Sequence, residues 1–268
     1  MKNKIGLVLS GGGIRGIAHL GLLKALDEIG VKPSAISGVS AGAIVGAMYA
    51  SGISPAEILE IGKSQINFGF SNLLLRKGGL FSREFIHKIL VENLPNNSFE
   101  SLQIPLIVNA TDFTSVESVY FSKGELIPCL EASASVPILF RPANYEGKML
   151  VDGGLLNNFP VEPLIGICDR LIGSHVNKLK EHDQAGKGLS RIATLERCYH
   201  ISISNSVYSK SHYCDLFIEP DLNGFGMLDT KHADIIFNRG YEATLEVKEQ
   251  ILKLAGKEIQ SQESENKS

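Results

Sequence analysis

The sequence predicts an α/β protein with a mostly parallel central sheet flanked by helices. Short apolar runs, which suit strands, alternate along the chain with longer segments whose apolar residues recur at helical spacing. Strands that alternate with helices pair in parallel, and the helices cover both faces of the sheet. The 268 residues show no internal repeat and no linker between domains. We therefore expect one domain over residues 1–256 and a polar, disordered tail over residues 257–268.

The first fifty residues carry the clearest pattern. They predict strands at residues 4–9 and 34–39, a helix that continues from a glycine-rich loop to about residue 29, and a helix at residues 41–50. Gly30 and Pro33 end the first helix. The second helix has Gly42, Gly46 and Ala50 on one face, and a face this small lets a helix lie close against a sheet.

Weaker signals place the remaining elements. Ser54 can cap a helix whose first turn contains Pro55. The other expected elements are a helix at residues 82–94, strands at residues 106–110, 118–122, 149–151 and 171–175, and one long helix at residues 229–255.

Composition narrows the classes of function. The chain is 44% hydrophobic and 21% charged, with a net charge of −3, which gives no electrostatic reason to expect nucleic acid as a partner. No apolar run approaches the ~20 residues that span a bilayer, and the N-terminal apolar stretch is too short for a signal peptide. We expect a cytoplasmic protein. Its scattered cysteines predict buried free thiols rather than a metal site; they are Cys129, Cys168, Cys198 and Cys214.

The glycine-rich loop admits more than one interpretation. Its residues, Gly11-Gly12-Gly13-Ile14-Arg15-Gly16, match the dinucleotide-binding pattern G-x-G-x-x-G between a strand and a helix. The second strand, however, lacks the acidic residue that would hold a ribose, and no P-loop lysine follows. Consecutive glycines also leave backbone N–H groups free to bind an anion, such as the oxyanion of acyl transfer. A flexible connector is the third interpretation.

The stretch GVSAG, from Gly38 to Gly42, matches G-x-S-x-G. This pattern alone is weak in a chain with 27 glycines, so its context decides. Here a short apolar strand precedes Ser40 and a helix of small residues follows it, which is the arrangement of a nucleophile elbow. We expect the N–H of Ala41 to point toward the glycine-rich loop.

A nucleophilic serine needs a base, and the sequence offers two kinds. Five histidines follow Ser40 in the second half of the chain, but none lies in a loop that the pattern marks as catalytic; they are His175, His182, His200, His212 and His232. His19, near the glycine-rich loop, is more typical of a packed residue. Asp152 is the better candidate, because it ends a predicted strand and two glycines follow it, although an ordinary Asp-Gly turn would look the same.

Taken together, these segments resemble the patatin-like phospholipase family, which is known by a G-G-G-x-R/K-G loop, a G-x-S-x-G elbow and a D-G-G/A motif in that order. The third motif is present as Asp152-Gly153-Gly154, and a small-residue block at residues 132–137 precedes it. The resemblance covers roughly residues 4–163. It implies a three-layer patatin-like fold, a Ser40–Asp152 dyad without histidine, and no metal or organic cofactor.

The resemblance also implies roles for the motif residues. The loop of Gly11, Gly12 and Gly13 would form the oxyanion hole, with Arg15 bracing it or assisting electrostatically. Glycines that support the motifs are Gly16, Gly38, Gly42, Gly153 and Gly154. To act as a base near neutral pH, Asp152 is expected in a partly desolvated site that raises its pKa.

The expected function is therefore a serine acyl hydrolase that cleaves carboxylic esters of lipids or of small molecules. Two alternatives stay open: a non-catalytic regulatory or lipid-binding protein on the same fold, and a conventional Ser-His-Asp esterase. The segment that begins at Phe68 and ends at Leu75 is apolar, and basic residues follow it. It predicts either a flap that touches the membrane surface transiently, which would make the protein peripheral, or ordinary core packing.

Overall fold

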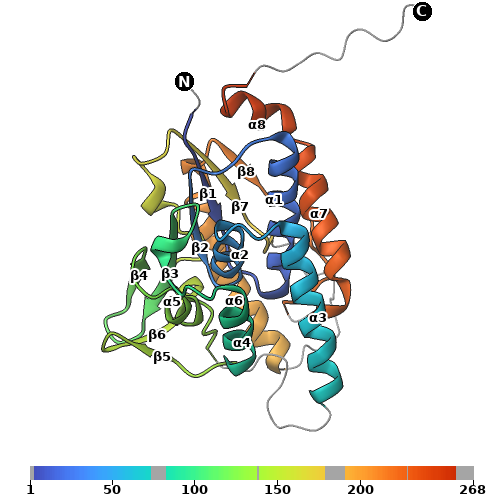
Figure 1. Cartoon of the computed structure of the whole chain (residues 1–268). Helices are drawn as coiled ribbons and strands as arrows, with labels where there is room; N and C mark the ends of the chain where they lie inside the picture. Colours follow the sequence, from blue (N-terminus) through green and yellow to red (C-terminus); the bar gives the residue numbers. More distant parts are fainter. Residues whose placement is uncertain (1–2, 74–82, 138, 179–190, 228, 258–268) are drawn as a thin grey trace, which may run out of the picture.

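The computed structural model describes residues 3–73, 83–137, 139–178, 191–227 and 229–257 (Figure 1). These residues form an eight-stranded sheet in which β4 pairs with β3 outside the main strand order of β5-β6-β3-β2-β1-β7-β8. Five strands run parallel: β1 (Ile5–Leu9), β2 (Ala35–Val39), β3 (Leu106–Asp112), β7 (Arg170–Ser174) and β8 (Leu216–Ile218). The antiparallel strands are β4 (Glu117–Phe121), β5 (Ala143–Tyr145) and β6 (Lys148–Asp152). The predicted α/β class with a mostly parallel sheet is confirmed.

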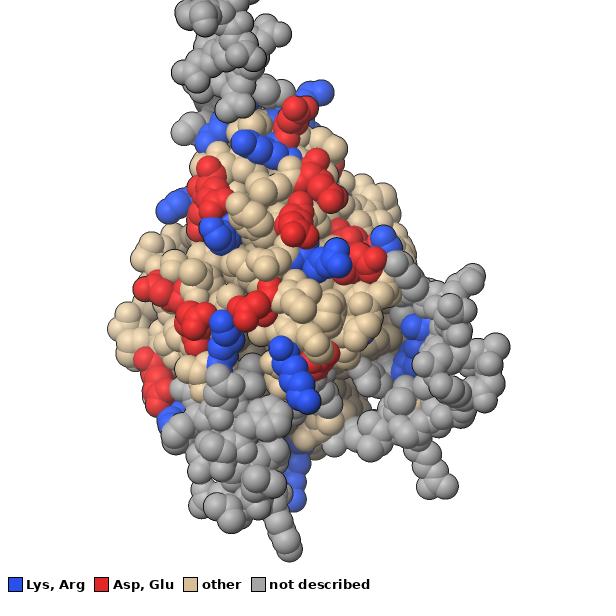
Figure 2. Space-filling view, turned by 90° about the vertical axis from the view of Figure 1, so that its right-hand side faces the viewer, with Lys and Arg blue, Asp and Glu red and all other residues tan. Residues whose placement is uncertain are grey.

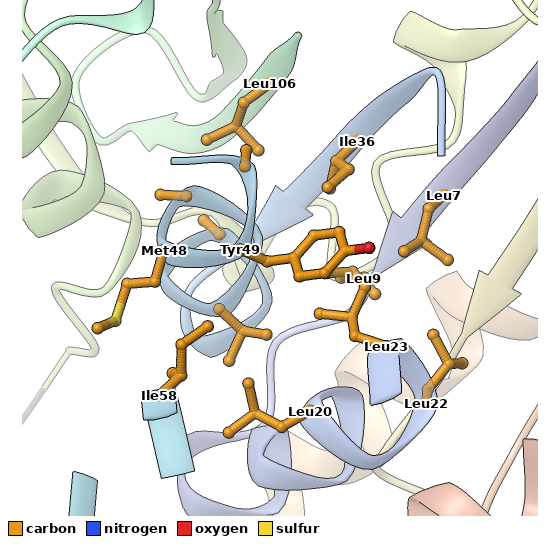
Figure 3. Close-up of a cluster of buried hydrophobic side chains, with 14 of the residues drawn as sticks. Leu7, Leu9, Leu20, Leu22, Leu23, Ile36, Met48, Tyr49, Ile58 and Leu106 are labelled. Atoms are coloured by element: carbon orange, nitrogen blue, oxygen red, sulfur yellow. The ribbon is translucent and has the colours of Figure 1, made fainter. Parts of the chain in front are cut away.

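Helices cover both faces of this sheet. They are α1 (Ile17–Ile29), α2 (Ala41–Ala50), α3 (Pro55–Leu73), α4 (Arg83–Asn93), α5 (Leu126–Ser133), α6 (Arg191–Tyr208), α7 (Ala233–Leu245) and α8 (Lys248–Leu254). Successive side chains of a strand point to opposite faces, so Leu7 and Leu9 of β1 enter one core while Val8 enters the other. Figure 3 shows the first core, where Leu7 and Leu9 face side chains of α1 and α2. The second core contains Phe159 and, from α6, Val207.

Helices α1 and α7 lie side by side at the right of Figure 1. Their contact is close because a glycine on each helix faces the backbone of the other. A Cβ on Gly21 would collide with the carbonyl of Phe237, and a Cβ on Gly240 would collide with that of Ala18. On this side of the molecule, acidic and basic side chains intermingle (Figure 2). Lys63 of α3, for example, binds Asp234 of α7 at 2.9 Å.

The structure corrects two expectations. The long helix expected at residues 229–255 breaks at residues 246–247 into α7 and α8, which turns α8 toward the N-terminus. The break lets Ile251 enter the core, and Asn3 then donates a hydrogen bond to the Leu254 carbonyl at 2.8 Å. Of the four cysteines expected to be buried, Cys129 is buried, Cys168 and Cys214 are half-buried, and Cys198 is exposed.

Other expectations lie partly outside the described residues. The segment 68–75 begins within α3, but its side chains and its last two residues are not described, so the flap stays a prediction. Most of the expected tail, from residue 258 onward, is likewise outside the described part. Among the helices that are described, none is long and apolar enough to cross a bilayer.

Candidate active site

Strand β3 brings the ends of β2 and β6 together. One edge of β3 pairs with β4 from Val108 to Asp112, so its other partners must share the opposite edge. Along that edge the last residue of β2, Val39, lies opposite Asn109. The last residue of β6, Asp152, lies opposite the next residue of β3, Ala110. Because β2 is parallel and β6 antiparallel to β3, their carboxyl ends meet. Ser40 directly follows β2 and therefore lies beside Asp152.

Ser40 occupies a strained backbone conformation at the start of α2, with φ 53° and ψ −123°. Non-glycine residues rarely adopt positive φ, and such strain persists only where the surroundings hold it. Here the Ser40 N–H donates to the hydroxyl of Ser133 at 2.8 Å, and that hydroxyl donates to the Asn109 carbonyl at 2.6 Å. Gly42 has no room for a side chain, because a Cβ would lie 2.6 Å from the Ser10 carbonyl oxygen. The geometry is that of a nucleophile elbow.

Asp152 is only 2% exposed. Its carboxyl accepts a hydrogen bond from the Gly154 N–H, at 2.7 Å from Oδ1, and the hydroxyls of Ser40 and Tyr199 lie near enough to favour its charged form. Burial raises the pKa of Asp152 to about 6, since it disfavours the charged form, and these three groups offset part of that rise. The expected desolvated environment is confirmed. A carboxylate with this pKa is ionised near neutral pH and still basic enough to accept a proton.

The glycine-rich loop lies against Ser40 and is fixed by its neighbours. Gly13 has a φ of 57°, which favours glycine. The N–H of Ile14 donates to the Met227 carbonyl at 2.9 Å, and the Asn177 amide donates to the Gly11 carbonyl at 2.6 Å. Within the described part of the chain, the N–H groups of the three consecutive glycines have no hydrogen-bond acceptor. These glycines line the same cavity as Ser40 and Asp152.

Arg15 lies behind the loop rather than in the cavity. Its Nε donates to the Phe225 carbonyl at 2.8 Å, and one terminal nitrogen donates to the Asn177 side chain at 3.3 Å. Asn177 in turn binds the Gly11 carbonyl, so the Arg15 contacts reach the loop through one intermediary. Its role in the oxyanion hole stays a prediction.

The cavity has a volume of about 200 Å³ and two chemically different sides. Ser40, Asp152 and the glycine-rich loop are the polar part of its lining. Most of the other lining residues are apolar, among them Ile44 of α2, Ile86 of α4 and Phe140 of the segment before β5. Apolar lining in the same cavity as a serine and a buried carboxylate suits a substrate with a hydrocarbon chain.

The described histidines do not line this cavity. His19 is fully buried under the glycine-rich loop, where its ring nitrogens bind the Ser174 hydroxyl and the Ser10 carbonyl, each at 2.9 Å. Burial lowers the pKa of His19 to about 4, so the ring is neutral at physiological pH. This is the packed role that the sequence suggests. His182 is outside the described residues.

Three residues of the site were not predicted from the sequence: Ser133, Asn158 and Tyr199. Ser133 ends α5 and Tyr199 lies in α6, two helices that the patterns did not reveal. Asn158 lines the cavity, and its buried Nδ2 has no hydrogen-bond partner among the described residues. The pair of asparagines after the D-G-G motif was the one local signal for Asn158. The described His, Cys, Asp and Glu side chains form no cluster of three that could hold a metal.

A parallel-stranded α/β sheet with an elbow serine, a buried aspartate and a glycine-rich loop at one edge defines a class of site for acyl transfer. The sequence model of the patatin-like phospholipase family matches residues 7–165, which include all three motifs. The chain belongs to this family.

Relatives found by sequence agree with that assignment. An uncharacterized NTE family protein of Mycobacterium tuberculosis is 33% identical over 167 residues, which cover 61% of this chain and 46% of that protein. Lysophospholipase NTE1 of Coccidioides immitis is 26% identical, over 98% of this chain and 19% of its own length. The chain thus spans less than half of these relatives.

Two solved structures share the fold. VipD from Legionella pneumophila matches with a TM-score of 0.56 and 18% identity, over 93% of this chain and 67% of that one. Human GIVD cytosolic phospholipase A2 matches with a TM-score of 0.54 and 12% identity, over 95% and 59% of the two chains.

Proposed function

We propose that this chain is a serine acyl hydrolase that cleaves carboxylic esters of lipids, with Ser40 as nucleophile and Asp152 as its base. The observation that carries the proposal is that the elbow serine, Ser40, shares one cavity with the buried Asp152 carboxyl and the glycine-rich loop. Family membership and the lysophospholipase name of the Coccidioides relative support a lipid ester as substrate. The apolar wall of the cavity supports a substrate that carries an acyl chain.

The first half of the reaction forms an acyl-enzyme. Ser40 Oγ attacks the ester carbonyl carbon while its proton passes to Asp152. The carbonyl oxygen becomes an oxyanion, and the free N–H groups of Gly12 and Gly13 stabilise it. The C–O bond to the alcohol then breaks, and Asp152 returns the proton to the leaving oxygen.

The second half releases the acid. Water takes the place of the alcohol and attacks the acyl carbon, giving its proton to Asp152. The bond to Ser40 Oγ breaks, and Asp152 protonates the serine again. The product forms as the neutral acid. Once it has lost its proton to solvent water, its carboxylate and the ionised Asp152 repel each other, which favours departure of the product.

A fluorophosphonate probe tests the nucleophile directly. We expect mass spectrometry to find the modification on Ser40, and Ser40→Ala to lose both labelling and hydrolysis of a short p-nitrophenyl ester. Ser122→Ala, at an exposed serine, is the matched control and should keep both. Hydrolysis by Ser40→Ala at the rate of the unmodified protein, or a probe adduct on another residue, contradicts the proposal.

The dyad also predicts that histidines are dispensable for the chemistry. Replacing each histidine in turn with Gln should leave turnover of the short ester within about threefold after correction for the folded fraction. A loss of several kcal/mol in transition-state stabilisation at one histidine would favour a Ser-His-Asp triad instead.

A further inference from the structure

Helix α6 brings a tyrosine into the site from a distant part of the sequence. Tyr199 lines the cavity, and its hydroxyl lies beside the Asp152 carboxyl, near enough to favour the charged form of that group. The geometry at Gly154 shows how closely these groups approach. A Cβ built on Gly154 would lie 3.0 Å from the Tyr199 hydroxyl, 2.9 Å from Asp152 Oδ1 and 2.7 Å from Asn158 Oδ1. The absence of a side chain at Gly154 therefore makes room for the tyrosine beside the carboxylate.

We propose that Tyr199 is a positioning residue whose hydroxyl fixes the Asp152 carboxylate in the orientation in which it accepts the proton of Ser40. This inference rests on the proposed function, in which Asp152 is the base. A carboxylate on a flexible side chain can rotate away from its partner, and a second hydroxyl restricts that rotation. Gly154 supplies a backbone N–H to Oδ1 of the same carboxyl group, so the group is held from both the turn and α6.

The tyrosine hydroxyl also affects the charge of Asp152. Burial raises the pKa of this carboxyl, and the tyrosine hydroxyl opposes that rise because it stabilises the ionised form. The pKa of Tyr199 itself lies well above its usual value, chiefly because of burial, so the hydroxyl stays protonated and remains a donor. Without it, Asp152 would be protonated, and inactive as a base, at a higher pH.

Few other groups act on Asp152. The Ser40 hydroxyl reaches it from the start of α2 and the Gly154 N–H from the turn after β6. Among the described residues, no Lys, Arg or His shifts its pKa. The neighbouring His200 of α6 has a pKa lowered to about 4, chiefly by burial, and carries no charge near neutral pH. A change in the pH dependence after removal of the tyrosine hydroxyl therefore has one source.

Tyr199→Phe tests the inference, since it keeps the ring and removes the hydroxyl. The matched control is Tyr208→Phe, which removes a tyrosine hydroxyl from the same helix. The Tyr208 hydroxyl lies outside the cavity and donates a hydrogen bond to the Glu219 carboxylate at 2.7 Å. The readouts are kcat and KM for a short p-nitrophenyl ester between pH 5 and pH 9, the rate of labelling by a fluorophosphonate over the same range, and the melting temperature.

We expect Tyr199→Phe to move the acid limb of both profiles upward by about one pH unit, the effect of losing one hydrogen bond to a charged group. At pH 6 kcat should fall about fivefold with KM little changed, because the ionised fraction of Asp152 falls from about one half to about one tenth, and this loss should become smaller toward pH 9. Tyr208→Phe should keep the profile of the unmodified protein.

Two outcomes overturn the inference: an unchanged profile, or an equal loss at every pH with the same midpoint, which would mark a structural role. Neither outcome affects the proposed function as long as Ser40→Ala is inactive. Activity in Ser40→Ala would instead remove the proposed function, whatever Tyr199→Phe does.

Discussion

Asp112 and Asp152 each end a strand and begin a turn, but the two aspartates have different surroundings. In the turn after β3, Asp112 Oδ1 accepts the N–H of Thr114 at 3.0 Å; in the turn after β6, Asp152 Oδ1 accepts that of Gly154 at 2.7 Å. The pKa values nevertheless move in opposite directions. The N–H groups of Ser115 and Thr114 lower the pKa of Asp112, whereas burial raises that of Asp152 to about 6.

The comparison shows that the hydrogen bond within the turn does not by itself raise the pKa of an aspartate. Both aspartates lie on paired strands, two register positions apart, and both accept a backbone N–H two residues ahead. Both side chains have little exposed surface, but burial is the largest influence on the pKa of Asp152, whereas hydrogen bonds from backbone N–H groups are the largest for Asp112, which also faces the exposed Lys148 at 3.9 Å. The raised pKa of Asp152 thus comes from desolvation, which the hydroxyls of Ser40 and Tyr199 partly oppose.

The largest difference should appear in turnover. Asp152→Asn keeps the size of the side chain but cannot accept a proton, so kcat should fall by ~10² or more, the contribution of a general base. Asp112→Asn should leave kcat nearly unchanged. Steady-state kinetics on a short ester compare the two, with circular dichroism to confirm folding. Near-normal turnover in Asp152→Asn would remove the dyad.

Stability should change in opposite directions in the same two variants. The folded pKa of Asp152 is above its unfolded value of 3.8, so the stability present at low pH is lost as the pH rises through about 6. Asp152→Asn should therefore raise the free energy of unfolding at pH 8 by up to about 3 kcal/mol, and by little at pH 4.

For Asp112, the dependence of stability on pH has the opposite sign. Its folded pKa is lowered, so its contribution is present above the unfolded pKa of 3.8 and is lost as the pH falls through the folded value. Asp112→Asn should lower the free energy of unfolding at pH 8. Urea titrations at pH 4 and pH 8 measure both changes, and equal signs in the two variants would contradict the comparison.

A smaller effect is expected from a substitution at the end of α5, where Ser133 contacts the elbow at Ser40. Ser133→Ala leaves the N–H of Ser40 and the carbonyl of Asn109 without their partner, which should cost about 1–3 kcal/mol of stability and reduce kcat. Ser135→Ala, two residues after the end of α5, is the control, since among the described residues its hydroxyl binds the Glu131 carbonyl and no group of the elbow. Equal effects of the two variants on kcat would show that the Ser133 hydroxyl does not support the elbow.

The smallest effect concerns the exposed turn. Val116 has a φ of 59°, which is costly for a β-branched residue, and its side chain is 69% exposed. Val116→Gly should raise the free energy of unfolding by up to about 1 kcal/mol without changing kcat. Val116→Ala retains a Cβ, so its free energy of unfolding should rise less than that of Val116→Gly. An equal increase in stability of the two variants in thermal melts would assign the effect to the side chain rather than the backbone.

The sequence predicted the parts of this site that local chemistry specifies. Glycine-rich motifs between recognisable strands and helices placed Ser40, Asp152 and the loop at the edge of the sheet. It did not reveal the roles of Tyr199 and Ser133, because their positions depend on how α6 and α5 pack. The small-residue block at residues 132–137 includes Ser133 but does not show that its hydroxyl contacts the elbow. The three-residue strands β5 and β8 are too short for a pattern, and the break before α8 goes with tertiary packing, in which Ile251 is buried.

The carboxyl ends of β2 and β6 lie next to each other along β3, and this arrangement has a consequence for folding kinetics. Ser40 follows the compact β1–α1–β2 segment, whose contacts are close in sequence and can form early. Asp152 reaches Ser40 only after β3 has paired with β2, which joins Ile36 to Leu106, 70 positions later in the sequence, and β6 has paired with β3; closing these loops costs entropy first. An intermediate that already holds the elbow would therefore contain a nucleophile without its base. Recovery of ester hydrolysis during refolding thus reports the late pairing of β3 with β6, and it should lag behind the recovery of helical signal.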